Sequence, residues 1–140
     1  MKLRKLVLPV LAAVMMAFVG CTPEPAAIID TYYVTVEPGE WSKNADMGYY
    51  FHETQLPAIT NHVIDNGAVF CYYIDNYGYD NLMPYVYPYT DDNGDLFWQN
   101  IRYDLTTGQI TFIIQESDMY TGGAVNSRMK FKVSIMYNRQ

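Results

Sequence analysis

Polar and apolar residues alternate along several stretches of the chain, most regularly in its last part. Between residues 129 and 137 every second side chain is apolar, and Lys130 and Lys132 lie at positions in between. A period of two predicts a β-strand with one face packed on a core and the other in contact with water. The alternation recurs in residues 96–105 and 109–115, on either side of a short polar turn. These two segments predict a β-hairpin.

Four further segments rich in β-branched and aromatic residues predict strands, at residues 32–36, 47–56, 68–74 and 83–87. Residues 68–74 are apolar at both odd and even positions, so we expect this strand in the middle of a sheet with both faces covered. Residues 83–87 stand among prolines, which confine a strand to the edge of a sheet because proline donates no backbone hydrogen bond. Residues 61–66 predict a single helical turn.

The turns between the predicted strands are short and rich in glycine, proline and asparagine. Residues 91–95 contain Asn93-Gly94, the pair that favours a tight hairpin turn, and residues 121–126 form a loop with two glycines. About seven short strands, with no helix of about ten residues, predict an all-β fold, an antiparallel β-sandwich of immunoglobulin-like kind. A small barrel is the alternative architecture.

The beginning of the chain differs in composition from the rest. Three basic residues precede an apolar run at residues 6–18, and the small Gly20 stands near the end of this segment. This order is typical of a secretory signal peptide. The apolar run is shorter than the roughly 18 to 20 residues that span a bilayer. We therefore expect residues 1–20 to be a signal peptide that is removed.

Cys21 stands directly after this predicted cleavage site. The arrangement resembles the lipobox of bacterial lipoproteins, in which the nucleophilic thiol takes a diacylglyceryl group before the peptidase cuts in front of it. We predict lipidation of Cys21 and anchoring in the outer membrane, because Thr22 is not the aspartate that can retain lipoproteins at the inner membrane. Acyl chains contribute about 0.8 kcal/mol per buried methylene to such anchoring. The alternative is a soluble secreted protein with an incidental cysteine.

The predicted domain plan therefore has three parts. Residues 1–20 are the signal peptide, residues 21–30 form a flexible tether with Pro23 and Pro25, and residues 31–140 form the β-sandwich. The sequence leaves open whether the sandwich lies on the periplasmic or the cell-surface face of the outer membrane.

Removal of residues 1–20 leaves six basic and fifteen acidic residues, which is a net charge of −9. This charge repels the phosphates of nucleic acids and of anionic lipids, so it argues against nucleic acid as a partner and against membrane binding through charge. The predicted membrane contact is the lipid anchor. With Cys21 acylated, Cys71 is the remaining thiol, and we expect it to be a buried hydrophobic residue because it lies in an apolar run.

Several short segments together resemble one family. They are Leu56-Pro57-Ala58-Ile59-Thr60, Asn66-Gly67-Ala68-Val69, Leu82-Met83-Pro84-Tyr85, Gly108-Gln109-Ile110-Thr111-Phe112 and Phe131-Lys132-Val133. Their order along nearly the whole mature chain is similar to that in small uncharacterised lipoproteins of Bacteroidetes-type gut bacteria. The resemblance supports the lipoprotein signal peptide and the immunoglobulin-like sandwich. It implies no activity, catalytic residue or cofactor.

Asp91, Asn93 and Asp95 bring oxygen ligands close together and partly match a calcium-binding loop. An EF-hand needs flanking helices and a glutamate at its twelfth position, which Arg102 occupies here. A hairpin turn explains the segment better than calcium binding does. We therefore expect neither a metal nor another cofactor.

Catalytic chemistry has few candidates in this sequence. His52 and His62 are the histidines of the chain, whereas a zinc site usually needs three or four ligands. The sequence contains neither a G-x-S-x-G nucleophile elbow nor a glycine-rich phosphate loop. We expect no catalytic residues and no enzyme activity. A hydrolase centred on His52, Glu53 and His62 is the alternative.

The excess of tyrosine is the most suggestive feature, with 14 tyrosines in 140 residues. Five of them lie close together in a segment expected to form a loop and an edge strand: Tyr77, Tyr79, Tyr85, Tyr87 and Tyr89. Aromatic rings with polar tips suit the recognition of sugars or of protein partners. In the alternative, at least half of these side chains pack inward.

Together these observations predict a membrane-anchored, non-catalytic binding module of the cell envelope. Its ligand would be a glycan or an envelope or host protein. A structural subunit of an envelope assembly is a further alternative.

Overall fold

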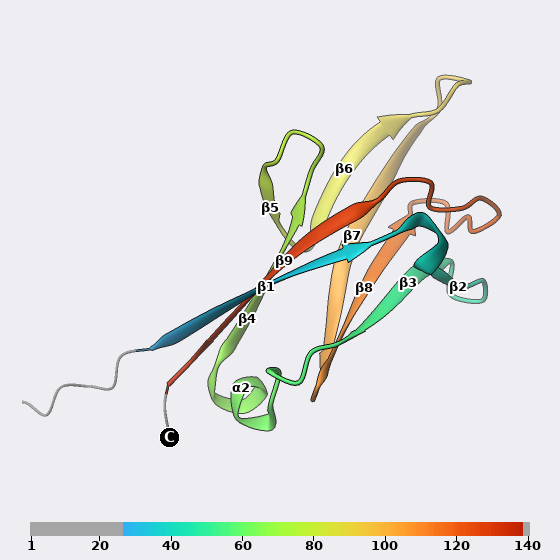
Figure 1. The fold of residues 1–140 in the computed structure, drawn as a ribbon. Coiled ribbons are helices and arrows are strands. Elements are labelled where there is room, and N and C mark those ends of the chain that lie inside the picture. The colour runs from blue at the N-terminus through green and yellow to red at the C-terminus, as the bar shows by residue number, and fades with distance from the viewer. Residues whose placement is uncertain (1–26, 139–140) are drawn as a thin grey trace, which may run out of the picture.

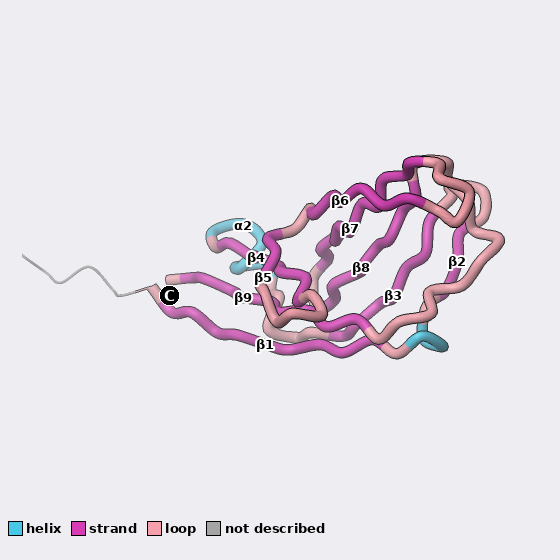
Figure 2. Tube along the Cα trace, turned by 90° about the horizontal axis from the view of Figure 1, so that it is seen from above, coloured by secondary structure: helices cyan, strands magenta, loops and turns pink. Residues whose placement is uncertain are grey.

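Two antiparallel sheets pack face to face in the computed structural model, which describes residues 27–138 (Figure 1; Figure 2). The four-stranded sheet has the order β1 (Ile28–Val36), β9 (Met129–Tyr137), β4 (Ala68–Ile74) and β5 (Asp80–Leu82). The five-stranded sheet has the order β2 (Ser42–Asn44), β3 (Tyr49–Gln55), β8 (Gln109–Glu116), β7 (Leu96–Thr106) and β6 (Tyr85–Thr90). The short helical elements are η1 (Pro38–Glu40) and α2 (Asn61–Asn66).

The alternation of apolar residues explains how the two sheets pack. Apolar side chains of β8 and β9 point into the space between the sheets, and these are buried: Ile110, Phe112, Ile114, Phe131, Val133 and Ile135. Burial of apolar surface contributes about 25 cal/mol per Å². A polar contact also joins the sheets, because the hydroxyl of Tyr103 on β7 donates a hydrogen bond of 2.9 Å to the carbonyl of Val69 on β4.

The predicted all-β fold, an antiparallel sandwich, is confirmed. The strand expected at residues 129–137 is β9, the expected hairpin is formed by β7 and β8, and the expected helical turn is α2. Gly108 in the turn of that hairpin has a φ of 79°, a backbone conformation that glycine adopts without steric cost. The finer, immunoglobulin-like assignment stays a prediction.

Residues 27–138 form nine strands rather than about seven. The difference lies in β2 and β5, which have three residues each and are too short to show a period of two in the sequence. In addition, β1 begins at Ile28, so residues 28–30 of the expected tether form part of a strand. They do so because they pair with the last residues of β9, Ile28 with Tyr137 and Ile29 with Met136.

The expectation that both faces of β4 are covered is wrong. β4 lies inside its sheet between β9 and β5, and Cys71 on its inward face is fully buried. Phe70 on the outward face, however, is 41% exposed. The five-stranded sheet covers only the inward face of the four-stranded sheet. The expected edge strand is confirmed, because β6 is the last strand of its sheet and contains Pro88.

The two ends of the sandwich carry different segments. β1 begins and β9 ends at the end that also holds α2 (Figure 1). The opposite end, called the distal end below, is formed by turns at residues 75–79 and 91–95 and by the loop at residues 117–128 (Figure 1). Within residues 27–138 there is no helix long and apolar enough to cross a membrane. The predicted signal peptide at residues 1–20 and the lipidation site Cys21 lie outside the described residues.

Candidate functional site

A polar pocket of about 170 Å³ opens at the distal end, beside the loop at residues 117–128. Strands of both sheets and the loop contribute its walls: Tyr50, Tyr73, Tyr87, Gln99, Glu116 and residues 124–127 are among the lining residues. We call this cavity the distal pocket. Most of its accessible lining is polar, in contrast to the apolar core below it.

Hydrogen bonds fix the side chains on one wall of the distal pocket. The Glu116 carboxylate accepts a 2.5 Å bond from the amide of Gln99 and a 2.7 Å bond from the hydroxyl of Tyr89. The hydroxyl of Tyr87 in turn donates to the amide oxygen of Gln99. Bonds to an ionised carboxylate are stronger than bonds between neutral groups. Glu116 therefore orients Gln99 and Tyr89 directly, and Tyr87 through Gln99.

The tyrosines of this network remain neutral over a wide pH range. Burial raises the pKa of Tyr87 to about 12, and the nearby Tyr73 and Glu116 add to the shift. Burial likewise raises the pKa of Tyr89 far above its ordinary value, and the hydrogen bond to Glu116 acts in the same direction. The wall thus combines neutral hydroxyl groups and an amide with a single negative charge.

Tyr50 fastens the loop that borders the distal pocket. It lies on β3, is 8% exposed, and donates a 2.8 Å hydrogen bond from its hydroxyl to the carbonyl of Gly123. Burial is the largest reason why its pKa is raised. This bond links a core strand to the loop at residues 117–128, and it therefore fixes the loop at the mouth of the pocket.

The five tyrosines predicted as ligand-binding residues fall into two groups. Tyr85, Tyr87 and Tyr89 alternate along β6 with exposed residues and are half-buried on its inward face. Their rings form a row, with centroids 5.8 Å apart for Tyr85 and Tyr87 and 6.5 Å apart for Tyr87 and Tyr89. These three tyrosines therefore pack inward, which was the alternative to ligand binding, although Tyr87 also lines the distal pocket.

Tyr77 and Tyr79 form the second group and extend into solvent, with exposed fractions of 88% and 69%. Their ring centroids are 6.5 Å apart. The carboxylate of Asp75 holds their turn, because one oxygen accepts backbone N–H bonds of 3.0 Å from Tyr77 and 2.9 Å from Tyr79. These bonds lower the pKa of Asp75, the bond from Tyr79 most of all. The turn at residues 75–79 follows β4 directly, one strand residue after Tyr73 of the distal pocket.

Asp91, Asn93 and Asp95, the calcium candidates, form the turn between β6 and β7. The carboxylate of Asp91 accepts backbone N–H bonds from Asn93 at 2.9 Å and from Asp95 at 2.8 Å. These bonds, that from Asp95 above all, lower the pKa of Asp91. The carboxylate of Asp91 thus holds the backbone of the hairpin turn. Among residues 27–138 no three His, Cys, Asp or Glu side chains gather as metal ligands would.

The structure does not bring the two histidines into one site. His52 lies on β3, where a ring nitrogen is 3.0 Å from the carbonyl of Glu40 and the ring packs edge-on against Trp41. His62 lies on α2, 3.1 Å from the carbonyl of Asn138. Glu53 follows His52 on a strand and therefore points to the opposite face.

Glu116 and Gln99 are the site residues that sequence reasoning missed. Gln99 and Glu116 are paired across β7 and β8, and this pairing follows from the hairpin turn at residues 106–109 once the register is counted back from it. Tyr50 shares its strand with other aromatic residues, and the sequence contains no sign of its contact with Gly123, 73 residues away.

We compared the chain with protein-family models, with curated proteins and with solved structures, and none of them matches. The candidate site is therefore defined by its geometry alone. The resemblance to small lipoproteins stays a prediction.

Proposed function

We propose that this protein is a lipid-anchored, non-catalytic binding module of the bacterial outer membrane that recognises glycans with its distal end. The observation that carries the proposal is the arrangement of the two ends. The chain enters the sandwich at Ile28, seven residues after Cys21. The turn at residues 75–79, which carries Tyr77 and Tyr79, and the loop at residues 117–128, which borders the distal pocket, lie at the opposite end (Figure 1). A lipid on Cys21 would thus leave the candidate site directed away from the membrane.

The chemistry of the distal end suits a neutral, polyhydroxylated ligand. Tyr87 and Gln99 offer hydrogen-bonding groups, and Glu116 supplies a fixed acceptor for ligand hydroxyls. Tyr77 and Tyr79 add ring faces, which stack on the apolar faces of sugars. The net charge of −9 after removal of residues 1–20 disfavours anionic ligands.

The single carboxylate among the described residues that line the distal pocket favours binding over hydrolysis. Glycoside hydrolysis usually requires two carboxyl groups on either side of the scissile bond. Among the described residues that line the pocket, Glu116 is the acidic one, and its two oxygens accept bonds from Gln99 and Tyr89.

A glycan array with the purified lipoprotein tests the proposed site. We expect binding to weaken at least about tenfold in the double variant Tyr77→Ala/Tyr79→Ala and in Glu116→Gln, because each loses aromatic or charge-assisted contacts. Ile64→Ala is the control, since Ile64 is 44% exposed on α2, at the end of the sandwich opposite to the site. Equal binding by all variants would contradict the site, and no binding to any glycan would contradict the ligand class.

The anchor needs its own measurement. Mass spectrometry of the protein isolated from its membrane should show a chain that begins at Cys21 and carries acyl groups. A chain that retains Met1, or a free Cys21 thiol, contradicts the anchor. Protease treatment of intact cells then decides between the periplasmic and the cell-surface face of the membrane.

A further inference from the structure

The outward face of the four-stranded sheet carries many apolar side chains although it faces solvent, with Lys130, Lys132 and Ser134 of β9 among them. Strand register places side chains of β1, β9, β4 and β5 in rows across this face, for example Tyr33, Lys132, Tyr72 and Leu82. Five large apolar side chains on it are exposed: Ile29, Tyr33, Phe70, Leu82 and Met136. Contiguous exposed apolar surface is rare on soluble monomers and usually marks an interface. We call this surface the outer face.

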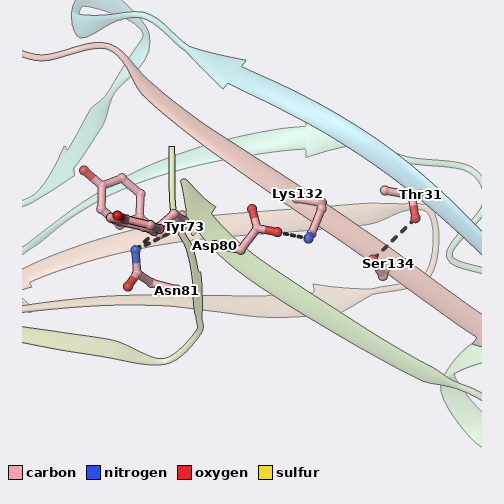
Figure 3. A network of polar contacts seen from close by, with 7 residues as sticks. Thr31, Tyr73, Asp80, Asn81, Lys132 and Ser134 are labelled. Atoms are coloured by element: carbon pink, nitrogen blue, oxygen red, sulfur yellow. Dashed lines mark hydrogen bonds and ion pairs between the residues drawn. The ribbon is translucent and has the colours of Figure 1, made fainter. Parts of the chain in front are cut away.

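The outer face is close to neutral in an otherwise acidic protein. Its charged side chains are Lys130, Lys132 and Asp80, and Lys132 forms an ion pair with Asp80 (Figure 3). The Lys132 ammonium also lies 4.4 Å from the ring centre of Tyr72. Thr31 and Ser134 satisfy one another across β1 and β9 with their hydroxyl oxygens 3.5 Å apart (Figure 3). The polar groups on this face are thus largely paired within the chain.

The charge distribution favours a second copy of the chain as the partner of the outer face. Two copies of a chain with a net charge of −6, or −9 after removal of residues 1–20, repel one another over most of their surfaces. On the outer face Lys130 is the charge left without an acidic partner among the described residues, so the repulsion is smallest there. An apolar, nearly neutral surface is complementary to itself, as a two-fold symmetric interface requires.

The dimensions of the outer face also match an interface. The strands β1, β9, β4 and β5 have 9, 9, 7 and 3 residues. At about 3.3 Å per residue and about 4.8 Å between strands, they give a flat area on the order of 400 Å². Side-chain relief raises the accessible area towards the roughly 800 Å² that each partner buries in a standard interface. Two sheets that pack in this way lie about 10 Å apart with their strands nearly aligned.

We propose that the outer face is covered by the outer face of a second copy, so that the protein is a homodimer of two sandwiches. A two-fold axis along the strands places both Ile28 ends on one side, where two lipid anchors reach the same bilayer and raise the effective concentration of the copies. That part rests on the proposed anchor, whereas the apolar face itself does not. Both distal pockets stay open, since they lie between the sheets at the far ends.

Cross-linking in the native membrane tests the dimer. The full chain carries Ser134→Cys at the middle of the outer face, or Val86→Cys, a 52% exposed position on the other sheet, as the matched control. The parent chain serves as the blank, because Cys71 is fully buried and any cross-link through Cys21 would appear in the parent as well. A short bifunctional thiol reagent should give a covalent dimer with Ser134→Cys and none with Val86→Cys.

Adding Phe70→Glu to Ser134→Cys should reduce the dimer at least about tenfold, because a carboxylate would be buried without a partner. Circular dichroism should show that this variant keeps its strands, as expected for an exposed position.

Three results overturn the proposal: the absence of a dimer with Ser134→Cys, a dimer unaffected by Phe70→Glu, or a cross-link to a different protein. So does a monomer whose Phe70→Trp fluorescence is quenched by brominated lipids, since a bilayer would then cover the face. Glycan binding and acylation are measured on the same samples, so failure of the dimer is separable from failure of the proposed function.

Discussion

The rings of Phe112 and Phe131 stack with their centroids 4.0 Å apart and their planes 13° from parallel. Phe112 lies on β8 and Phe131 on β9, so this contact joins the two sheets at the centre of the core. Both side chains are fully buried. Closely packed interiors do not relax fully around a lost ring, and a cavity remains in its place.

We therefore expect Phe131→Ala to lower the free energy of unfolding by about 3–5 kcal/mol. Chemical denaturation followed by circular dichroism measures the change. Leu96→Ala serves as the control, because Leu96 is exposed at the start of β7 and should change the stability by less than about 0.5 kcal/mol. Equal losses in the two variants would show that the stacked rings do not form the core.

The sequence was sufficient to predict this core contact in part. The period of two at residues 109–115 and 129–137 identifies Phe112 and Phe131 as inward-facing. The pattern contains no information on which strands pair, so it could not show that the two rings belong to different sheets and meet. Strands of three residues such as β2 and β5 were missed because a period needs more residues than they have.

Phe70 shows a different limit of the same reasoning. A strand with apolar residues on both faces indicates that both faces are covered, and the second cover need not come from the same chain. The distal pocket shows a third limit, because the bond from Tyr89 to Glu116 joins residues 27 positions apart on strands that are not neighbours. A local sequence pattern predicts a strand, whereas the distal pocket depends on how several strands are arranged in space.

The buried tyrosines of the distal pocket predict how stability depends on alkaline pH. The pKa of Tyr87 is about 12 in the folded chain and about 10 in the unfolded chain. The unfolded state therefore loses its proton first as the pH rises. The stabilisation is complete below pH 10 and is lost progressively as the pH rises towards 12.

Denaturation curves between pH 9 and about 12 measure this effect. The free energy of unfolding of the parent chain should fall across the upper part of that range, and Tyr87→Phe should make the fall less steep. Glu116→Gln should lower the pKa values of Tyr87 and Tyr89, because the negative charge of Glu116 contributes to both shifts. Absorbance of tyrosinate near 295 nm reports these values. A profile that is the same for all three proteins contradicts the hydrogen-bonded network.

The turn that presents Tyr77 and Tyr79 should lose stability at acid pH, because the ionised carboxylate of Asp75 holds it. Backbone N–H bonds, that from Tyr79 above all, lower the pKa of this carboxyl below its ordinary value of 3.8. The ionised form is thus the one that holds the turn. Its contribution is present above pH 3.8 and is lost as the pH falls through the lower, folded-state pKa.

We expect the amide resonances of Tyr77 and Tyr79 to shift together below pH 3.8 in an NMR titration, with the same midpoint as the Asp75 carboxyl. Asp75→Asn keeps an acceptor oxygen without the charge, so the turn should persist and the joint shift should vanish. A midpoint above 3.8, or a shift that remains in Asp75→Asn, would mean that another group holds the two tyrosines in place.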